Sequence, residues 1–261
     1  MNPSEYQAMF RVEDHLWWYT GMRRIAEQIM GERLDGAGRR LAILDAGCGT
    51  GGNLAWLARF GEVYGVDLSP LAVEFCTQRH LTTISRASVL ELPYPDGAFD
   101  LVTSFDVIYH LQVRDDVAAL AEMRRVLKPG GWAYVRVPAL EPLRSAHDMA
   151  VHTRQRYDVA ELREKARLAG LDVVRATYAN TLLFPVAAAS RLLARLRNHG
   201  APADHGQNEE VRSDVRPAPA AVNAMLSAVL GAEAALLGRL NLPIGLSAVV
   251  LARRPQALAL P

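Results

Sequence analysis

The chain has 261 residues, of which 50% are hydrophobic and 22% are charged, and its formal net charge is +1. This length and composition are typical of a globular protein with a sizeable core, and the near-neutral charge argues against a polynucleotide substrate. The two cysteines form no CxxC pair, and no signal-peptide pattern opens the chain. We therefore expect a cytoplasmic protein without a disulfide framework. The longest apolar run, residues 181–190, is about half as long as a membrane-spanning helix, so any membrane contact should be peripheral.

The segment before the first strand-like run has the pattern of a helical cap. Residues 6–25 read YQAMFRVEDHLWWYTGMRRI, with two adjacent tryptophans, one histidine and three arginines. We expect residues 1–40 to close over a binding site as a lid that excludes water. Trp17, Trp18 and Tyr19 would then line the substrate site, although packing of these rings against a sheet explains the pattern as well.

Short β-rich runs alternate with helical segments through the core, residues 41–180. Strands are expected at 41–46, 62–67, 82–87, 101–105, 132–137, 171–179 and 246–254. Strands that alternate with helices form parallel sheets with right-handed crossovers. The prediction is therefore an α/β fold: a doubly wound, Rossmann-like, mostly parallel sheet of seven strands.

A helix is expected after the fifth strand, in the stretch YDVAELREKARLAGLDV. Asp158 stands at its N-cap position with Glu161 three residues later, which is a capping-box pattern. Gly170 stands where the helix should end.

Residues 181–243 separate the last two strands and predict a helical insertion that caps the substrate site. Helices are expected at about 186–197 and 220–240, between which lies a polar stretch. The second helix carries eight apolar residues on one stripe: Val222, Met225, Leu226, Val229, Leu230, Leu236, Leu237 and Leu240. The alternating leucines and arginines of SRLLARLRN suit an amphipathic cap, a membrane surface or a partner. The last strand, in 244–254, is followed by a tail at 255–261.

A glycine cluster follows the first strand in LAILDAGCGTGGNLAWL. Gly47, Gly49 and Gly52 fit the dinucleotide pattern GxGxxG, and Asp67 lies twenty residues beyond Gly47, where a ribose-binding carboxylate belongs. An NAD site is one interpretation. Asp45, however, would repel a phosphate at the mouth of the loop and would favour a ligand with an ammonium group. A nucleoside with an amino-acid tail, S-adenosylmethionine, fits both carboxylates.

Four stretches in order resemble the class I S-adenosylmethionine-dependent methyltransferase family: ILDAGCGTGGNL, YGVDLSP, LPYPDGAFDLVTSFDVIYHL and RRVLKPGGWAYVRVP. The motifs are similar to those of the type 11 methyltransferases, and the N-terminal pattern resembles enzymes of bacterial glycan and secondary-metabolite pathways. The resemblance implies a binding site for S-adenosyl-L-methionine and its product S-adenosyl-L-homocysteine. Its expected residues are Asp45, Gly47, Cys48, Gly49, Gly51, Asn53, Asp67, Leu68, Ser88, Val89, Leu90, Phe105 and Arg23.

The resemblance also implies roles within this set. Asp67 should bind the ribose hydroxyls, Leu68 should pack on the adenine, and Arg23 should lie near the methionine carboxylate. Ser88 stands where the family often has an acidic residue. We therefore expect the Ser88 hydroxyl and the Val89 backbone to recognise the adenine.

Methyl transfer needs an aligned nucleophile and, for some acceptors, a base. Histidine suits proton transfer near neutral pH, and the candidates after the fourth and fifth strands are His110, His147 and His152. Polar and aromatic residues of the same segments should contact the substrate: Tyr109, Asp148, Arg156 and Tyr157. If this region is helical, Asp148, His152 and Arg156 share one face. The alternative, that these histidines only cap or pack, stays open. The spacing fits no zinc motif, and no metal is expected.

The sequence therefore predicts methyl transfer to an oxygen or nitrogen atom of a small molecule, such as a secondary metabolite or a sugar-type acceptor. C-methylation of a quinone-like or lipid-like acceptor is an alternative, as is non-methyl chemistry on the bound cofactor. An NAD-dependent oxidoreductase and a non-catalytic binding module are less favoured. We expect no nucleic-acid partner, and either a monomer or a homodimer.

Overall fold

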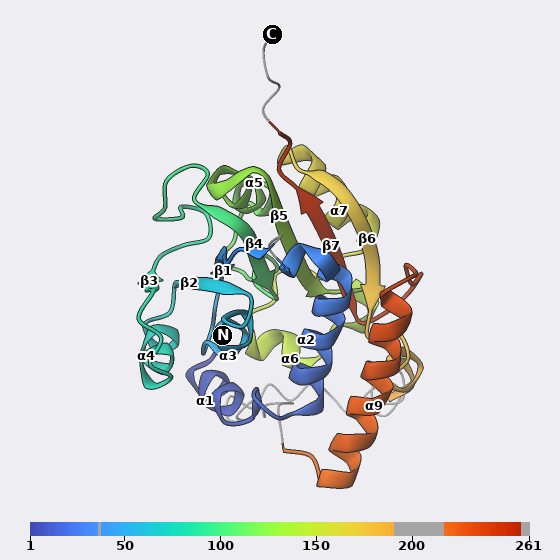
Figure 1. Ribbon diagram of the computed structural model, residues 1–261. Helices are drawn as coiled ribbons and strands as arrows, with labels where there is room; N and C mark the ends of the chain where they lie inside the picture. The colour runs from blue at the N-terminus through green and yellow to red at the C-terminus, as the bar shows by residue number, and fades with distance from the viewer. Residues whose placement is uncertain (36–37, 191–216, 257–261) are drawn as a thin grey trace.

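The computed structural model describes residues 1–35, 38–190 and 217–256. Figure 1 shows a single sheet with helices on both of its faces. The expected helix at 186–197 falls within the described residues only in part, since residues 184–190 are helical and the rest lies outside them. Most of the polar stretch before residue 220 and of the tail at 255–261 also lies outside the described residues.

The sheet has seven strands, and each overlaps an expected range. In chain order they are β1 (Leu41–Ala46), β2 (Gly61–Asp67), β3 (Ile84–Arg86), β4 (Phe99–Phe105), β5 (Leu127–Pro138), β6 (Asp172–Ala179) and β7 (Ser247–Arg253). Their order across the sheet is β3-β2-β1-β4-β5-β7-β6. Only β7 runs antiparallel to its neighbours. The expected fold class is confirmed, and the strand order reverses between β1 and β4, where sheets of this kind bind ligands at their carboxyl edge.

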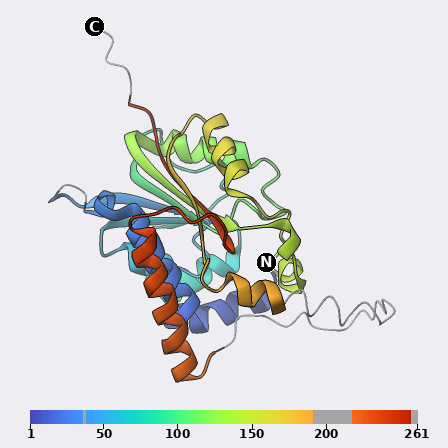
Figure 2. The same ribbon diagram turned by 90° about the vertical axis from the view of Figure 1, so that its right-hand side faces the viewer.

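Helices cover both faces of the sheet. They are α1 (Pro3–Val12), α2 (Trp17–Met30), α3 (Gly52–Leu57), α4 (Pro70–Gln78), α5 (Asp116–Val126), α6 (Ala146–Ala150), α7 (Val159–Leu168) and α9 (Ala220–Leu237), with short 3-10 turns at Gly31–Leu34 and Glu141–Leu143. The helices α5 and α7 lie on one face, while α2 lies on the other with α9 alongside it (Figures 1 and 2). The helix α1, the short α6 and the N-terminus gather at the carboxyl edge of the parallel strands.

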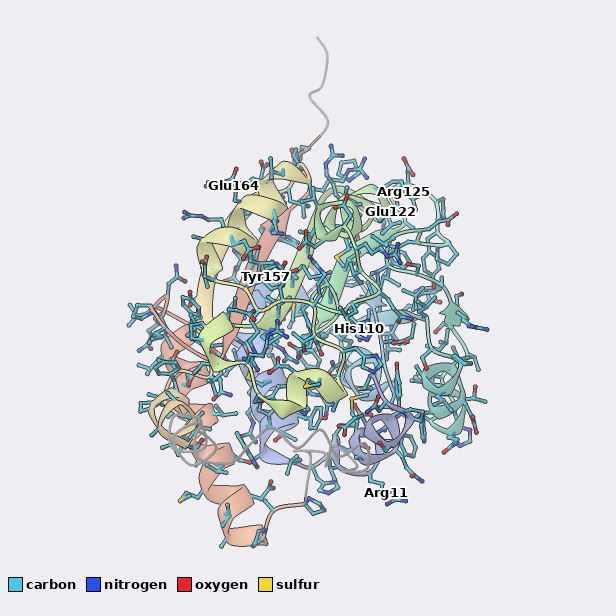
Figure 3. The ribbon with its side chains drawn as sticks, turned by 180° about the vertical axis from the view of Figure 1, so that it is seen from behind. Arg11, His110, Glu122, Arg125, Tyr157 and Glu164 are labelled. Atoms are coloured by element: carbon cyan, nitrogen blue, oxygen red, sulfur yellow. The ribbon has the colours of Figure 1, made fainter. Side chains whose placement is uncertain are left out.

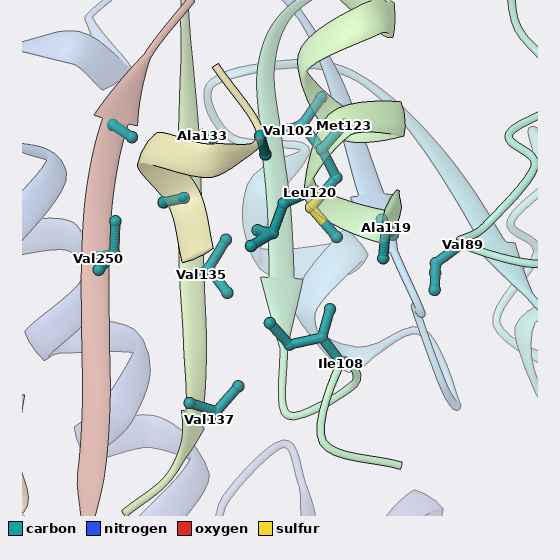
Figure 4. Packing of buried hydrophobic residues seen from close by; sticks show 14 of the residues in the cluster. Val89, Val102, Ile108, Ala119, Leu120, Met123, Ala133, Val135, Val137 and Val250 are labelled. Carbon is teal, nitrogen blue, oxygen red and sulfur yellow. The ribbon is translucent and has the colours of Figure 1, made fainter. Parts of the chain in front are cut away.

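The core on the α5 face is built from aliphatic side chains of helix and strands. Leu120 and Met123 of α5 lie beside Val102 of β4, and they share one buried cluster with Val135 of β5 and Val250 of β7 (Figure 4). These five side chains are at most 1% exposed. Burial of each such side chain contributes about 1.5–3 kcal/mol, so this layer fixes the strands whose ends form the carboxyl edge.

The α2 face has a second core, which also receives α9. Met22 and Ile25 of α2 join Leu101, Tyr134 and Leu230 in one buried cluster. The cluster connects the N-terminal cap, the sheet and the insertion, so the three parts that the sequence separates share one core.

The helix α9 differs from its expected pattern. Leu230 and Leu237 are fully buried, but Val222 and Met225 of the same expected stripe are 41% and 59% exposed. Among the described residues, α9 is also long and apolar enough, by length and composition alone, to cross a membrane. The sequence analysis took the shorter run at 181–190 as the longest apolar stretch, and α9 corrects that expectation. In this structure α9 packs along α2.

The helix α7 begins and ends as expected. The Asp158 side chain accepts a hydrogen bond from the Glu161 backbone nitrogen at 2.8 Å, and Gly170 follows the last turn with φ of 79°. The reciprocal bond of a capping box is replaced, because the Glu161 carboxylate accepts from Gln155 at 2.9 Å.

Candidate active site at the carboxyl edge

The loop between β1 and α3 has a backbone that glycine adopts most easily. Gly47, Gly49 and Gly51 have φ of 89°, 54° and 86°, a region that residues with a Cβ rarely occupy. A Cβ on Gly47 would also lie 2.3 Å from Cγ2 of Val107. The glycines therefore allow the loop to pack closely against the segment that follows β4.

Asp45, at the end of β1, is a fully buried carboxylate. Its Oδ1 accepts a hydrogen bond from the Thr103 hydroxyl at 2.8 Å, and its Oδ2 is buried without a partner among the described residues. Burial raises the pKa of Asp45 to about 7, although the Thr103 bond and the charge of Arg136 favour ionisation. An unsatisfied buried acceptor is costly, so this oxygen suits a ligand that brings a donor, such as an ammonium group.

Asp67, at the end of β2, lies beside the same loop. Its Oδ2 and Oδ1 accept hydrogen bonds from the backbone nitrogens of Gly49 and Ser69, both at 2.9 Å. Burial raises the pKa of Asp67, while these two bonds favour the ionised form. Leu68 follows with 42% of its surface exposed. The carboxylate is oriented at the strand end, and its contact with a ribose stays a prediction.

The turn after β3 contains the residues expected to bind adenine. The Ser88 hydroxyl accepts a hydrogen bond from the Leu90 backbone nitrogen at 3.1 Å, and Val89 is buried. Ser88 therefore shapes this turn.

The glycine loop also contains one of the two cysteines. Cys48 Sγ lies 4.0 Å from Cys76 Sγ of α4, and both thiols are free and buried.

A buried ionic network joins the cap to the glycine loop. The Glu13 carboxylate accepts hydrogen bonds from the Thr50 hydroxyl and from Arg79, the latter at 3.0 Å. Arg23 Nη2 lies 3.9 Å from the same carboxylate, and Arg23 Nε donates to Asn53 Oδ1 at 3.0 Å. Sequence reasoning missed Glu13, Thr50 and Arg79, because no spacing connects a residue of the cap with partners 37 and 66 positions away.

The helix α1 lies over the glycine loop. Met9 Cε would be 3.1 Å from a Cβ at Gly49. Phe10 packs on Phe75 of α4 with ring centroids 4.7 Å apart, and the Arg79 guanidinium lies over the Phe10 ring. The cap is therefore in contact with the loop, as a lid that excludes water would be.

An ion pair stands where β4 and β5 end. Asp106 has φ of 57°, and its Oδ2 accepts hydrogen bonds from Nε of Arg136, at 3.0 Å, and from Nη2. Arg136 is 5% exposed, and its guanidinium lies 5.0 Å from the Trp18 ring and 5.2 Å from the Phe105 ring. The sequence analysis missed Arg136, although a lone charge in the apolar strand WAYVRVP was a usable signal.

The aromatic residues expected to contact the substrate or the cofactor pack mainly against other protein side chains. Trp18 packs edge-to-face on Tyr19, with centroids 4.8 Å apart, and burial raises the pKa of the Tyr19 hydroxyl. Phe105 is 7% exposed and contacts Tyr134 in the core. Phe105 therefore lies under α2, and its contact with a cofactor stays a prediction.

Two of the three expected bases come together. The rings of His110 and His152 have centroids 5.5 Å apart, and His110 lies near the middle of the molecule in Figure 3. His152 Nε2 is 3.0 Å from Asn2 Oδ1, and the Met1 amino nitrogen is 3.0 Å from His110 Nε2. Burial lowers the pKa of His110 to about 4 and also lowers the pKa of His152. Both imidazoles are therefore neutral near pH 7, and Nδ1 of His110 accepts a hydrogen bond from the Gln112 backbone nitrogen at 3.1 Å.

The expected helical face of Asp148, His152 and Arg156 is wrong. The helix α6 ends at Ala150, and His152 has φ of 57°, which turns the chain back. Asp148 and Arg156 meet nonetheless in a buried pair with two bonds of 2.9 Å. Arg156 is 8% exposed and already paired with Asp148. It therefore stabilises this loop, and its contact with a substrate stays a prediction.

Tyr157 and Tyr109, two further expected substrate contacts, are also buried. The Tyr157 hydroxyl donates to Asp116 Oδ2 at 2.6 Å, and its side chain is fully buried, so its direct contact with a substrate stays a prediction. Tyr109 is 8% exposed, and burial raises its pKa. His147 Nδ1 is buried without a partner among the described residues. Trp17 contributes its backbone nitrogen to a bond with Asn223.

Two cavities of about 300 and 490 Å³ open at the opposite, amino edge of the sheet. Arg39, Asp100 and Lys128 line both of them. Asp100 accepts hydrogen bonds from both cations and from the Ala42 backbone, so its charge is satisfied. No group of three or more metal-binding side chains occurs among residues 1–35, 38–190 and 217–256. The chemistry-bearing residues therefore concentrate at the carboxyl edge.

The fold is the seven-stranded, Rossmann-like α/β arrangement of the class I methyltransferases. A comparison with protein-family models matches residues 44–135 to the methyltransferase domain family. A probable S-adenosylmethionine-dependent methyltransferase of Mycolicibacterium smegmatis is 35% identical over 136 residues, which are 50% of this chain and 52% of that protein. A fatty-acid O-methyltransferase of the same organism is 38% identical over 96 residues, 34% of each chain. The chain thus spans about half, or less, of the length of these relatives.

Among solved structures, a putative sarcosine dimethylglycine methyltransferase from Galdieria sulphuraria superposes with a TM-score of 0.55. It is 21% identical, over 90% of this chain and 85% of that one. At 21% identity, this similarity shows a shared fold and no more. Taken together, the family match, the relatives and the fold identify residues 44–135 as a class I S-adenosylmethionine-dependent methyltransferase domain, whose cofactor is S-adenosyl-L-methionine. The residues present fit that cofactor, because the unpaired oxygen of Asp45 needs a donor.

Proposed function

We propose that the protein transfers the methyl group of S-adenosyl-L-methionine to an oxygen or nitrogen atom of a small-molecule acceptor. The observation that carries the cofactor part is the buried Asp45 with one unpartnered oxygen, beside a glycine loop and a second carboxylate, Asp67. A fatty-acid O-methyltransferase among the relatives supports an oxygen acceptor in the same kind of domain.

The chain's own residues would act on three parts of the cofactor. Asp45 would hold the ammonium group, Asp67 the ribose hydroxyls, and the turn at Ser88 the adenine. When bound, the cofactor supplies an electrophilic methyl group. The cap helix α1, packed on the loop, would keep water out of this space.

The acceptor would approach between the cap and the ends of β4 and β5. His110 and His152 stand there as neutral imidazoles, and one of them would take the proton that a hydroxyl acceptor loses as the methyl group is transferred. An amine that arrives unprotonated would need no base, and positioning alone would then carry the reaction.

The first test is calorimetric titration with S-adenosylmethionine, S-adenosylhomocysteine and, separately, NAD. Wild type should bind the two sulfur ligands and not NAD, and Asp67→Ala should weaken binding at least tenfold, because it removes a charge-assisted acceptor for the ribose. Asp172→Ala, an exposed carboxylate at the start of β6, is the matched control and should bind as wild type. Binding of NAD alone would overturn the proposal.

A further inference from the structure

The helix α2 begins without a capping side chain from its own segment. Its N-cap residue, Leu16, offers no side-chain hydrogen bond. The Trp17 backbone nitrogen instead donates to Oδ1 of Asn223, in α9, with an N···O distance of 2.7 Å. Asn223 Nδ2 in turn donates to the His15 carbonyl at 3.0 Å. A residue 206 positions away along the chain thus performs the work of an N-cap.

The helix that carries Asn223 is itself firmly attached. Glu233 of α9 is fully buried, and its Oε2 accepts hydrogen bonds from the backbone nitrogens of Thr181 and Leu182, at 2.8 and 2.9 Å. Leu230 packs so closely on Gly21 that a Cβ there would lie 2.4 Å from its Cδ1. Figure 2 shows α9 running beside α2. The helix α9 therefore forms a fixed support for α2.

The first turns of α2 carry side chains that reach the carboxyl edge. Trp18 covers Arg136, which holds Asp106 at the end of β4. Arg23, further along the same helix, reaches Asn53 at the start of α3. A shift of the beginning of α2 would move both contacts.

We infer that Asn223 is a positioning residue, which holds the first turn of α2 so that Trp18 and Arg23 lie over the carboxyl edge. The insertion thereby sets the position of the lid. The inference rests on the proposed function only in taking this edge as the cofactor and acceptor site.

Hydrogen exchange of the ligand-free protein tests the first part. In Asn223→Ala the amides of residues 15–19 should exchange about five- to tenfold faster, which is the size expected for loss of a helix cap. Asn223→Asp keeps the acceptor for Trp17 but loses the donor for His15, so its exchange should be intermediate. Asn241→Ala is the matched control, because Asn241 is also an asparagine between residues 181 and 243 whose Oδ1 accepts one bond of 2.7 Å, from Arg175. In Asn241→Ala the amides of residues 15–19 should exchange at the wild-type rate.

Exchange in the presence of S-adenosylhomocysteine tests the second part. In wild type the product should protect both residues 17–23 and the loop 47–52. In Asn223→Ala, loop protection should remain while protection of 17–23 falls, which a general loss of stability would not produce. Unchanged exchange at 15–19 in Asn223→Ala, or an equal rise in β4 and β5, would overturn the inference. Failure of wild type to bind the product would instead count against the proposed function, and the ligand-free exchange would still decide the role of Asn223.

Discussion

The environment of Asp45 differs strongly from that of an ordinary surface carboxylate. It has one hydrogen bond and no exposure, and burial raises its pKa to about 7. A bound ammonium group would favour its ionised form. Ligand binding and proton release from Asp45 are therefore expected to be linked.

The first prediction concerns this linkage. The affinity for S-adenosylhomocysteine should rise with pH, by up to about tenfold per unit below pH 7, because only ionised Asp45 attracts the ammonium group. Calorimetry from pH 5.5 to 8, in two buffers of different ionisation enthalpy, measures both the affinity and the proton release. Asp67 and Glu13 also have raised pKa values, so Asp45→Asn is the control that isolates Asp45. It should bind more weakly and with little pH dependence, and a flat profile in wild type would contradict the prediction.

The second prediction concerns the two neutral imidazoles. With a hydroxyl acceptor found by screening, His110→Ala and His152→Ala should each lower the rate, and the residue that acts as base should do so by about 10²- to 10⁴-fold. Affinity for the cofactor should stay within about twofold. The rate should persist down to about pH 5, since the pKa of His110 is lowered to about 4. Production of S-adenosylhomocysteine measures the rate, and equal rates in both variants and wild type would exclude the pair as base.

At the level of elements, the glycine loop depends on backbone conformation and space together. Gly47→Ala should destabilise the protein by at least about 1–3 kcal/mol and weaken cofactor binding, because the new methyl group would displace Val107. Gly97→Ala is the matched control. Gly97 also has a positive φ, 69°, but its nearest contact for a Cβ is at 4.0 Å, so this variant should lose some stability and keep its affinity. Thermal unfolding and calorimetry distinguish the two effects.

The contact between α2 and α9 gives a further prediction. Gly21→Ala should destabilise the protein by about 1–3 kcal/mol through overpacking against Leu230, and Leu230→Ala by about 2–5 kcal/mol through a cavity. The double variant should lose less stability than the sum of the two single losses, because the new methyl group fills part of the cavity. Additive changes in the free energy of unfolding, measured with denaturant, would show that Gly21 and Leu230 are not energetically coupled.

Local patterns predicted most of these elements. The seven strands were predictable because β-rich runs alternate with helices, and the glycine loop because Gly47, Gly49 and Asp67 have a recognisable spacing. The Asp148–Arg156 ion pair was not predicted, since the left-handed backbone at His152 reverses a segment that the sequence allowed to be helical. Contacts such as Glu13–Arg79 and Trp17–Asn223 join residues 66 and 206 positions apart. Such contacts depend on the assembled fold, and spacing along the chain carries no sign of them.

At the scale of the whole molecule, two sets of groups oppose each other as pH changes. His110 and His152 have lowered pKa values, so the stability they contribute is lost as pH falls from about 6.5 toward 4. Asp45, Asp67 and Glu13 have raised pKa values, so the stability they contribute is lost as pH rises from about 4, for Asp45 until about 7.

Both ranges lie between about pH 4 and 7, so the two contributions oppose each other there, and above about pH 7 stability should change little through Asp45 and the two histidines. S-adenosylhomocysteine should raise the melting temperature more at pH 8 than at pH 5.5, because it provides a partner for the ionised carboxylate. Melting curves from pH 4.5 to 8.5, with and without the product, measure both effects. In Asp45→Asn the loss of stability between about pH 4 and 7 should be smaller than in wild type, and a loss identical to wild type would assign it to other groups.

The place of β7 also has a consequence for how the molecule is made. This strand is the last in the sequence, yet it lies between β5 and β6 in the sheet. Until Ser247–Arg253 leaves the ribosome, β5 and β6 each present an open strand edge, and open edges pair readily with other chains. Loss of only these seven residues would leave two unpaired edges in the middle of the sheet. Shortened forms that end before Ser247 should therefore aggregate during synthesis, even though the glycine loop and both carboxylates precede that point.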